Sequence, residues 1–511
     1  MFRHKADTAV GCCIHLTRRK EMKIHTLFIS KEGWQVGWPY LGFDNEQVRS
    51  SVLGRLRERF PEIEFTGGEV LTDYEPTEME RIRREIGEAD GLLLYIVGHY
   101  GYPEVGPLEA LLQLGKPSIL ANHLYGGNFI FIQLCERIRG KSLRVLPVSS
   151  PDLGDLEWAV GVMQGLLRLK GKRVLVYAPD EIEISAEGLA ELTAPDLAEM
   201  PEEQRASVMA MMGNIASIGH YLDITGADQA HQWRRDEERY RRNMGEVFGL
   251  KLLRRDPKEL AESYRKADEG EAEEIAERWL KAAKGAKCSR QAVVNEARLY
   301  LGIKELVEET GADSMTLDCG TLLIMGCLPA LPCLGLFQLL NDGFMAGEEA
   351  DLDSHISTLL GYHLFGRPGY ISNHTLDLTN NRVTYLHCMA PARLHGPEKP
   401  PAEYEIVRHG EAHFVGAVPR VEFPIGEDLT TVKVSLLEKK LALRHGKIVG
   451  QVVDEKACVN KVLVEDDADK ILENYDWMAF GWHRVSFVGD WRREFKAAAR
   501  LAGLELVEED K

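Results

Sequence analysis

Short apolar runs alternate with helical stripes of apolar residues in the first third of the chain. Four of these runs are typical of parallel strands, at 23–30, 92–97, 117–121 and 143–147. Between them, Val48, Val52 and Leu56 recur at every fourth position of 45–59, and residues 108–114 and 129–139 also predict helices. This alternation predicts a parallel α/β domain over residues 22–165.

The same alternation resumes in the middle third and is interrupted by a long charged segment. Residues 172–178 and 314–318 predict two further strands. Residues 202–305 between them predict mostly helix, and both signs of charge are interspersed there, which is typical of solvated helix faces. We therefore expect a second α/β domain over residues 166–345 with a helical insertion.

The last third has a different pattern, in which short strand-like runs are separated by Gly, Pro, Asn and Asp. After a predicted helix at 351–365, these runs follow at 382–388, 403–408, 418–424, 430–437, 440–445 and 447–453. A predicted helix at 491–503 closes the chain. Residues 346–511 therefore predict a β-rich domain, a sandwich or a small barrel. The predicted fold class is α/β, with two Rossmann-like parallel α/β domains followed by a β-rich, barrel-like C-terminal domain.

The composition agrees with a globular protein of about three domains, since the chain has 511 residues and 44% hydrophobic side chains. The 62 basic and 80 acidic residues give a net charge of −18, which disfavours binding to nucleic acid or to an anionic membrane. The nine cysteines form no CxxC pair, so we expect free thiols in a reducing, cytoplasmic setting.

No segment predicts a membrane span or a signal peptide. The most apolar stretch, 321–340, is interrupted by two glycines and two prolines. Residues 1–20 carry basic side chains at both ends of a short apolar run at 9–13. We expect residues 1–21 to form a disordered tail, and translation could start at Met1 or at Met22.

Candidate chemistry is concentrated in the C-terminal third, because the chain has no dinucleotide-binding glycine motif, Walker A sequence or HExxH motif. Glu348, Glu349, Asp351 and Asp353 lie together around the start of the predicted helix at 351–365. The helix dipole stabilises such acids by about 0.3–1 kcal/mol each, which explains one or two of them. Four like charges repel one another, so the pattern also indicates a metal site.

Three polar side chains farther along the chain are also candidates. Asn373 directly follows a strand-like run, where α/β proteins often place functional residues, although a turn explains it equally well. His387 shares its strand face with Val383 and Tyr385, and His483 lies in a similar alternation. Each histidine taken alone is more typical of a hydrogen-bonded core residue than of a metal ligand.

The order and spacing of these residues resemble the L-fucose isomerase and L-arabinose isomerase superfamily. The resemblance covers about residues 314–503 and rests on an ordered set of short motifs, Pro332-Cys333, Leu340-Asn341-Asp342-Gly343, Glu348-Glu349-Ala350-Asp351, Gly366-Arg367-Pro368, Leu386-His387-Cys388, Trp482-His483 and Gly489-Asp490. The N-terminal half agrees with the family only in its double α/β layout.

The resemblance implies a ketol isomerase that holds a Mn²⁺-type ion with two carboxylates and a histidine. Glu349 matches the first carboxylate, and His483 matches the C-terminal histidine. Asn373 occupies the position of the second carboxylate, 24 residues after Glu349, and its carbonyl oxygen could still bind a hard cation. His387 lies where arabinose-type members supply another histidine, and Asp351 is a possible additional ligand. The resemblance also implies a homo-oligomer, a trimer or a hexamer.

Interconversion of an aldose and a ketose through an enediol explains why such residues are needed. A divalent ion polarises the sugar carbonyl, and a carboxylate moves a proton between two adjacent carbons. Asparagine cannot act as a base, so Glu349 would take more of this role, or Asp377 or His374 would replace the missing acid. Two alternatives remain open, a sugar-binding homologue without isomerase activity and a metal-dependent lyase or epimerase acting on a sugar or sugar acid.

Overall fold

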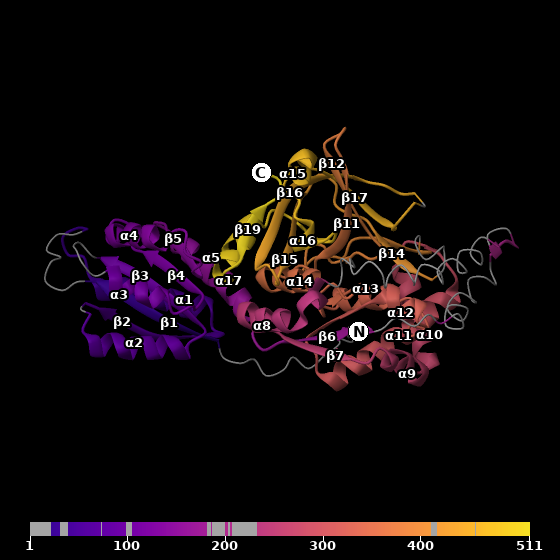
Figure 1. Cartoon of the computed structure of the whole chain (residues 1–511), viewed down its shortest axis with the longest axis horizontal. Helices are drawn as coiled ribbons and strands as arrows, with labels where there is room; N and C mark the ends of the chain where they lie inside the picture. Colours follow the sequence, from indigo (N-terminus) through magenta and orange to yellow (C-terminus); the bar gives the residue numbers. More distant parts are fainter. Residues whose placement is uncertain are drawn as a thin grey trace, which may run out of the picture.

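The computed structural model describes residues 22–30, 39–72, 74–98, 105–180, 185, 200–202, 205–206, 232–409, 416–454 and 456–511. The predicted tail at 1–21 and residues 207–231 of the predicted helical insertion lie outside the described residues. Figure 1 shows three units, a first α/β unit at the left, a second α/β unit at the lower right and a β-barrel unit at the top. Within the described ranges, no helix has the length and apolar character needed to cross a membrane, and no cysteine forms a disulfide.

The first unit is a five-stranded parallel sheet in the order β2-β1-β3-β4-β5. Its strands are β1 (Met22–Ser30), β2 (Ile63–Leu71), β3 (Gly91–Gly98), β4 (Ser118–Asn122) and β5 (Val145–Ser149). One face is covered by α1 (Asn45–Arg59) and α5 (Leu153–Leu167), and the other by α2 (Pro76–Glu88), α3 (Val105–Leu112) and α4 (Asn128–Ile138). β3 is buried at every position, as its apolar sequence predicts. β2 has no predicted counterpart, because Gly67 and Gly68 interrupt its apolar pattern.

The second unit is a four-stranded parallel sheet in the order β10-β9-β6-β7. Its strands are β6 (Arg173–Tyr177), β7 (Lys251–Arg255), β9 (Ser314–Leu317) and β10 (Ala346–Gly347). The helical elements are η1 (Gln232–Asp236), α8 (Glu237–Phe248), α9 (Lys258–Lys266), α10 (Glu269–Ala282), α11 (Arg290–Thr310), α12 (Cys319–Ile324) and α13 (Cys333–Asn341). The described part of the predicted insertion is mostly helical, but it also contains β7 and the short strand β8 (Ala286–Lys287). Because the sheet is parallel, the loops after its four strands meet at one edge.

The third unit is a closed barrel of six antiparallel strands in the order β15-β18-β11-β12-β17-β16, and pairing of β16 with β15 completes the circle. The strands are β11 (Tyr370–Asp377), β12 (Arg382–His387), β15 (Asp428–Ser435), β16 (Lys440–Gln451), β17 (Asn460–Glu465) and β18 (Arg484–Val488). β19 (Glu505–Glu508) extends the sheet beside β16. The barrel-like domain is confirmed, but the two predicted runs at 440–445 and 447–453 form the single strand β16, because the ladder continues through Gly446.

Two of the predicted runs form strands outside the barrel. The runs at 403–408 and 418–424 become β13 (Tyr404–Val407) and β14 (Val418–Val421), and β13 also pairs with β8 of the second unit. The short helices α15 (Ala468–Glu473) and α16 (Trp477–Phe480) precede β18.

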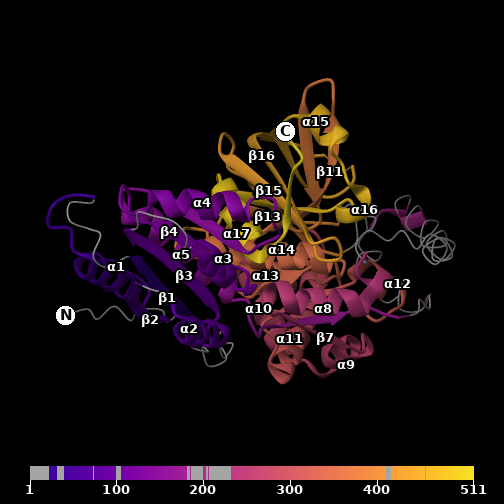
Figure 2. The ribbon, with the colours of Figure 1, turned by 60° about the vertical axis from the view of Figure 1, so that its left-hand side comes forward.

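Two helices of the C-terminal third connect the barrel with the first unit. The predicted helices at 351–365 and 491–503 are α14 (Leu352–Phe365) and α17 (Arg492–Ala502), and both pack against α5 (Figure 2). Gly165 permits the close approach of α5 and α14, since a Cβ there would lie 2.8 Å from the carbonyl oxygen of His363. Because helices pack across the three units, the domain boundaries at 165 and 345 stay predictions.

Candidate metal centre

Two histidines meet beside the middle of strand β11. The first half of β11 pairs with the start of β18, and its second half pairs with β12, from Asn373 opposite Leu386 to Asp377 opposite Arg382. His387 ends β12 and His483 directly precedes β18, so the barrel register brings both histidines to the same place. Their ring centroids lie 5.4 Å apart, with the ring planes at 72°.

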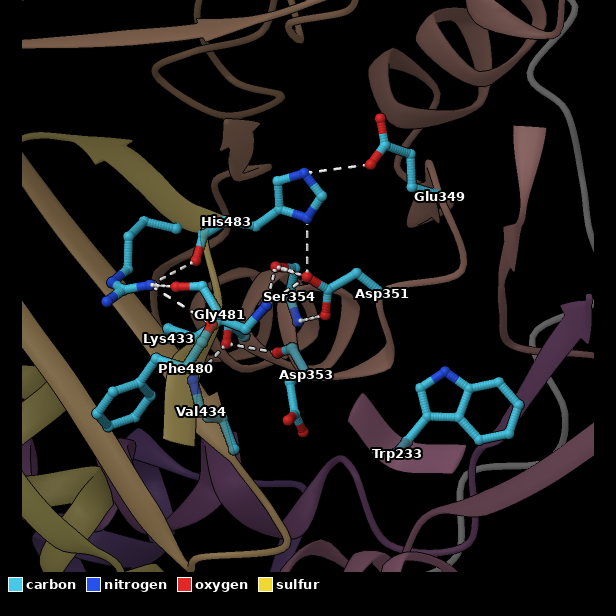
Figure 3. A network of polar contacts seen from close by, with 12 residues as sticks. Trp233, Glu349, Asp351, Asp353, Ser354, Lys433, Val434, Phe480, Gly481 and His483 are labelled. Carbon is cyan, nitrogen blue, oxygen red and sulfur yellow. Dashed lines mark hydrogen bonds and ion pairs between the residues drawn. The ribbon is translucent and has the colours of Figure 1, made fainter. Parts of the chain in front are cut away.

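A carboxylate reaches these histidines from the second unit. Glu349 lies in the loop after β10, and the backbones of Glu349 and Ala350 are left-handed, with φ angles of 56° and 48°. Non-glycine residues adopt such a conformation at a cost of about 1–3 kcal/mol each, so surrounding contacts must hold it. The amide of Ala350 donates to the carbonyl of Leu317 at 3.0 Å, and Nε1 of Trp233 donates to the carbonyl of Ala350 at 3.0 Å. The loop turns the Glu349 side chain toward His483 (Figure 3).

Glu349, His387 and His483 form a group that could hold a metal ion. Oε1 of Glu349 lies 3.5 Å from Nε2 of His387, and Oε2 lies 3.2 Å from Nε2 of His483. One ligand atom from each of the three residues lies within 4.8 Å of the other two. Ligand atoms bound at about 2.1 Å are about 3.0–3.4 Å apart in octahedral or tetrahedral sites, so this spacing suits a divalent cation.

A buried carboxylate lies behind each histidine. Nδ1 of His483 is hydrogen-bonded to Oδ2 of Asp351 at 2.9 Å (Figure 3). Nδ1 of His387 lies 2.7 Å from Oε2 of Glu348, at an angle that makes the contact an ion pair rather than a straight hydrogen bond. A carboxylate on Nδ1 fixes the ring and leaves Nε2 as the ligand atom, which is the usual arrangement of metal-binding histidines. Both imidazoles therefore present Nε2 to Glu349.

The electrostatics of the metal-free group follow from these contacts. Burial alone would raise the pKa of Glu349, but His483 and His387 hold it well below its ordinary value. Burial alone would lower the pKa of His387, but Glu348 and Glu349 raise it well above its ordinary value. The pKa of His483 is also raised, because Glu349 and Asp351 outweigh the effect of burial. Protons on the histidines thus balance the carboxylates, and binding of a cation would release them.

A buried lysine completes the surroundings of Asp351. The ammonium of Lys433 contacts Oδ2 of Asp351 and donates to Oγ of Ser354 at 2.6 Å. Oδ1 of Asp351 accepts a hydrogen bond from the backbone amide of Ser354 at 3.0 Å, which makes Asp351 the N-cap of α14. Burial opposes ionisation of Asp351, but Lys433 and His483 hold its pKa below the ordinary range. Asp351 therefore stays charged and can hold both the helix and His483.

The four acids around this helix start have different partners. Glu348 lies behind His387, Glu349 faces both histidines, and Asp351 caps α14 and holds His483. Asp353 takes no part in the group, since its Oδ1 accepts from the hydroxyl of Tyr240 at 2.8 Å. Burial raises the pKa of Asp353 to about 7. The helix-dipole explanation therefore suits Asp351, and the metal-site explanation suits Glu349.

The structure brings together four of the predicted site residues, Glu349, Asp351, His387 and His483. Asn373 lies in the middle of β11, opposite Leu386, rather than at the end of a strand as predicted. Its Oδ1 atom is buried and has no hydrogen-bond partner in the described part of the chain. Among the described contacts, none joins this oxygen to Glu349, His387 or His483, so the place of Asn373 in a metal site stays a prediction.

The other two candidates, Asp377 and His374, have different surroundings. Asp377 is exposed at the end of β11 and accepts a hydrogen bond from Nδ2 of Asn380 at 2.6 Å. It lies four residues beyond Asn373, which is about 13 Å along a strand. The His374 ring is buried near Tyr475, at 5.4 Å between centroids, and burial lowers its pKa well below the ordinary value. Among the described contacts, none joins Asp377 or His374 to Glu349.

Sequence reasoning missed the roles of Glu348, Lys433 and Trp233. Glu348 was one acid among four, and its position behind His387 depends on contact between two units. Lys433 had a signal, because it is the only charged residue in the strand-like run 430–437. A charge in such a run predicts a buried partner of opposite sign, which is Asp351. Trp233 had no comparable signal.

A second group with the same residue types lies in the first unit. His25 of β1, Glu69 of β2 and Glu85 of α2 also have ligand atoms within 4.8 Å of one another. Arg81 donates to both Glu69 and Glu85 at 2.7 Å. Because the guanidinium already neutralises these carboxylates, this group does not suit a cation.

No protein-family model matches the chain, and no curated protein sequence matches it either. The fold and the site define an α/β protein with a closed antiparallel barrel and a group of residues compatible with a divalent cation. The resemblance to the sugar isomerases stays a prediction from the motifs.

Proposed function

We propose that the protein is a divalent-metal-dependent sugar isomerase that interconverts an aldose and a ketose through an enediol. The observation that carries the proposal is the group Glu349, His387 and His483, with a carboxylate behind each imidazole. These residues belong to the motifs that resemble the L-fucose and L-arabinose isomerase superfamily. Mixed carboxylate and imidazole ligands also fit the Mn²⁺-type ion that the resemblance implies.

Each residue of the site has a distinct role in this proposal. Glu349, His387 and His483 would hold the ion. The buried Oδ1 of Asn373, which has no hydrogen-bond partner in the described part of the chain, is the neutral oxygen that the resemblance adds to this set. When bound, such an ion polarises the sugar carbonyl and stabilises the negative charge of the enediolate. Asp351 keeps the His483 imidazole in its orientation, and Lys433 keeps Asp351 ionised.

Proton transfer between the two sugar carbons needs a base at this site. Asp377 is exposed at the end of β11 and the His374 ring is buried near Tyr475, so Glu349 is the remaining candidate. Its side chain is 36% exposed, whereas that of His387 is 2% exposed, so Glu349 is the ligand that a sugar can reach. We propose that Glu349 accepts the proton from one carbon and returns it to the next.

Turnover of a panel of aldoses and ketoses with added Mn²⁺ tests this function. In D₂O, an enediol route exchanges the hydrogen on the reacting carbon with solvent, which NMR detects. Replacing Glu349 with Gln should lower the rate by about 10²–10⁴-fold, as expected for loss of a general base. His25→Ala is the control and should keep the rate. Absence of both turnover and exchange in metal-loaded protein, for every common pentose and 6-deoxyhexose, would reject the isomerase.

A second candidate is a sugar-binding homologue without isomerase activity, or a metal-dependent lyase or epimerase on a sugar or sugar acid. The neutral Asn373 in the position of the second carboxylate favours these alternatives, because it supplies no base. Sugar binding in calorimetry without hydrogen exchange would identify the binding protein. Hydrogen exchange without conversion of aldose to ketose would identify the lyase or epimerase.

We also propose that the protein acts in the cytoplasm as a homo-oligomer, a trimer or a hexamer, as the resemblance implies. Analytical ultracentrifugation at micromolar concentration measures the state directly. A monomer under these conditions would contradict the proposed assembly without affecting the metal-site proposal.

A further inference from the structure

A cavity of 560 Å³ opens at the carboxyl edge of the second sheet. The chain after β6 goes on to η1, α8 and β7 on one side, whereas the chain after β9 goes on to β10 on the other side. Adjacent strands whose connections leave in opposite directions form the crevice where open α/β sheets usually bind ligands. The cavity borders this crevice: residues 178–180 after β6, and Met325 and Cys327 after α12, line one part of it, and residues 254–258 at the end of β7 line another.

Four cationic side chains line this cavity, Arg241, Arg254, Arg255 and Lys258, in a chain whose net charge is −18. The acids beside them are engaged in holding the arginines. Glu237 accepts from Arg241 at 2.6 Å and from Arg254 at 3.0 Å, and Asp180 also pairs with Arg254. The lining therefore contains arginines whose positions are fixed before any ligand arrives.

Lys258 is the cation of the lining that remains available. Its side chain is exposed, and no carboxylate in the described part of the chain pairs with its ammonium. The neighbouring acid, Asp256, accepts instead from the backbone amide of Lys258 at 3.0 Å. Arg255 binds Glu259 through Nε at 3.0 Å and its Nη2 lies 3.5 Å from Oε1 of Glu309, so Nη1 is the nitrogen of this guanidinium without a hydrogen-bond partner among the described residues. An ammonium and a guanidinium N–H with free donors suit an oxyanion, because charge-assisted hydrogen bonds are the strong ones.

The cavity is separate from the metal centre but lies on the same edge of the sheet. None of Glu349, His387 and His483 lines it, and three strand spacings, about 14 Å, separate β7 from β10. Trp233 connects the two places, since Arg254 lies 5.4 Å from its ring centroid and its Nε1 donates to Ala350.

We infer that this cavity binds a small ligand through an oxyanion, a phosphate ester or a carboxylate, held by Lys258 and Arg255. The inference goes beyond the proposed isomerase function and does not depend on it. Phosphate and carboxylate share the chemistry that these donors recognise, and the experiment distinguishes them.

Calorimetric titration of the metal-chelated protein with inorganic phosphate, and separately with acetate, tests the inference. Saturable binding of phosphate assigns a phosphoryl ligand, and saturable binding of acetate alone assigns a carboxylate. Lys258→Met should weaken that binding about 10-fold, as expected for loss of one charge-assisted hydrogen bond. The matched control is Lys266→Met, because Lys266 is exposed on the same helix, outside the lining, and its replacement changes the net charge equally.

Three outcomes would overturn the inference. The first is the absence of saturable binding for both anions. The second is an equal loss in Lys258→Met and Lys266→Met, which would show a general effect of charge. The third is loss of binding in Glu349→Gln, which would place the anion at the metal centre. Binding that survives Glu349→Gln and fails only in Lys258→Met supports the cavity, whatever the result for isomerase activity.

Discussion

Two groups in this protein combine histidine with glutamate, with ligand atoms within 4.8 Å of one another in each, but their surroundings are opposite. In the first unit, Arg81 bonds both Glu69 and Glu85, and His25 lies beside carboxylates that are already neutralised. At the barrel, no lysine or arginine of the described chain pairs with Glu349, and only histidines face it. The carboxylates beside this group, on Glu348 and Asp351, lie behind the imidazoles instead of competing for the ion.

This difference teaches that ligand types and spacing are insufficient to define a metal site. Binding of a cation is favourable only if no fixed positive charge of the protein already neutralises the carboxylates. Burial lowers the pKa of His25, whereas Glu348 and Glu349 overcome burial and raise the pKa of His387. The first group is thus balanced by a built-in guanidinium, and the second is balanced by protons that a metal ion can replace.

The largest expected effect comes from removing the ligands themselves. Glu349→Gln, His387→Ala and His483→Ala should each weaken Mn²⁺ binding by at least about 100-fold, more than the loss of an orienting residue costs. His25→Ala, the matched change in the other group, should leave the dissociation constant within a factor of two. Calorimetric titration of chelator-treated protein measures both. Loss of Mn²⁺ binding in His25→Ala would show that the ion binds to the group of the first unit instead of the group at the barrel.

Removing the carboxylates behind the histidines should have a smaller effect. Glu348→Gln and Asp351→Asn should each weaken Mn²⁺ binding by about 10–100-fold, because the imidazoles lose their fixed orientation. Asp353→Asn is the control, since Asp353 is equally buried at the start of α14 but bonds Tyr240 instead of a histidine. Similar losses in all three variants would show that helix stability, not imidazole orientation, controls the site.

Adding a charge next to the histidines should strengthen the site. Asn373→Asp should raise Mn²⁺ affinity about 10-fold, since the number of charged ligands tunes the affinity of oxygen-rich sites. It should also raise aldose–ketose turnover by supplying a second carboxylate. Unchanged affinity together with lower turnover would show that Asn373 is not a replaced ligand.

Removing the guanidinium should make the first group resemble the second. Arg81→Met leaves Glu69 and Glu85 without their shared cation, so a second and weaker equivalent should appear in the Mn²⁺ titration. The double variant Arg81→Met with His25→Ala should lose this second equivalent. A titration that stays at one equivalent in Arg81→Met would show that the geometry of the first group, not its arginine, excludes the ion.

The smallest effect concerns pH. The folded-state pKa of His25 is lowered by burial, so acidification below its unfolded value of about 6.5 protonates the unfolded chain first and destabilises the fold. Urea unfolding at pH 7 and at pH 5 measures this effect. His25→Gln should lose less unfolding free energy than the wild type between these two pH values. In the metal-chelated protein, His387 has the opposite effect on the free energy of unfolding. Its pKa is raised in the folded state, so it stabilises the fold below pH 6.5, and this stabilisation is lost as the pH rises through the raised pKa. A flat difference between wild type and His25→Gln across this range would contradict the assignment.

Local patterns predicted much of the fold, because single elements depend on neighbours in sequence. The apolar run at 92–97 and the alternation at 382–388 predicted β3 and β12. The strand order of the closed barrel could not be predicted from local patterns. β15 and β16 form a local hairpin, but the circle also needs β18 to pair with β11 and β15, and β12 to pair with β17, which are all far apart in sequence. β2 was missed because its paired glycines weaken the strand signal.

The candidate site was predicted only in part, because much of it also depends on contacts between residues that are far apart in sequence. The motifs indicated Glu349 and His483, and the structure brings these residues to 3.2 Å although 134 positions separate them. Nothing in the sequence predicts the left-handed backbone of Glu349, because the hydrogen bonds that hold this loop join the next residue, Ala350, to Leu317 and Trp233. The position of Glu348 behind His387 and that of Lys433 beside Asp351 likewise depend on contacts between distant parts of the chain.

The three ligand residues come from two different units of the fold, and this has a mechanical consequence. Glu349 belongs to a loop of the second sheet, whereas both histidines belong to the barrel, and the chain itself joins these two bodies only a few residues later through α14. Other contacts also join the second unit to the barrel, among them the hydrogen bonds from Nδ2 of Asn243 to the carbonyl of Leu436 at 2.8 Å and from Arg235 to the carbonyl of Met478 at 3.0 Å. The contacts of Glu349 with His387 and His483 add a further attachment between the two bodies, at the candidate metal site itself. An ion bound by all three residues would therefore link sheet and barrel directly, so metal binding should also raise the resistance of these two bodies to separating during unfolding.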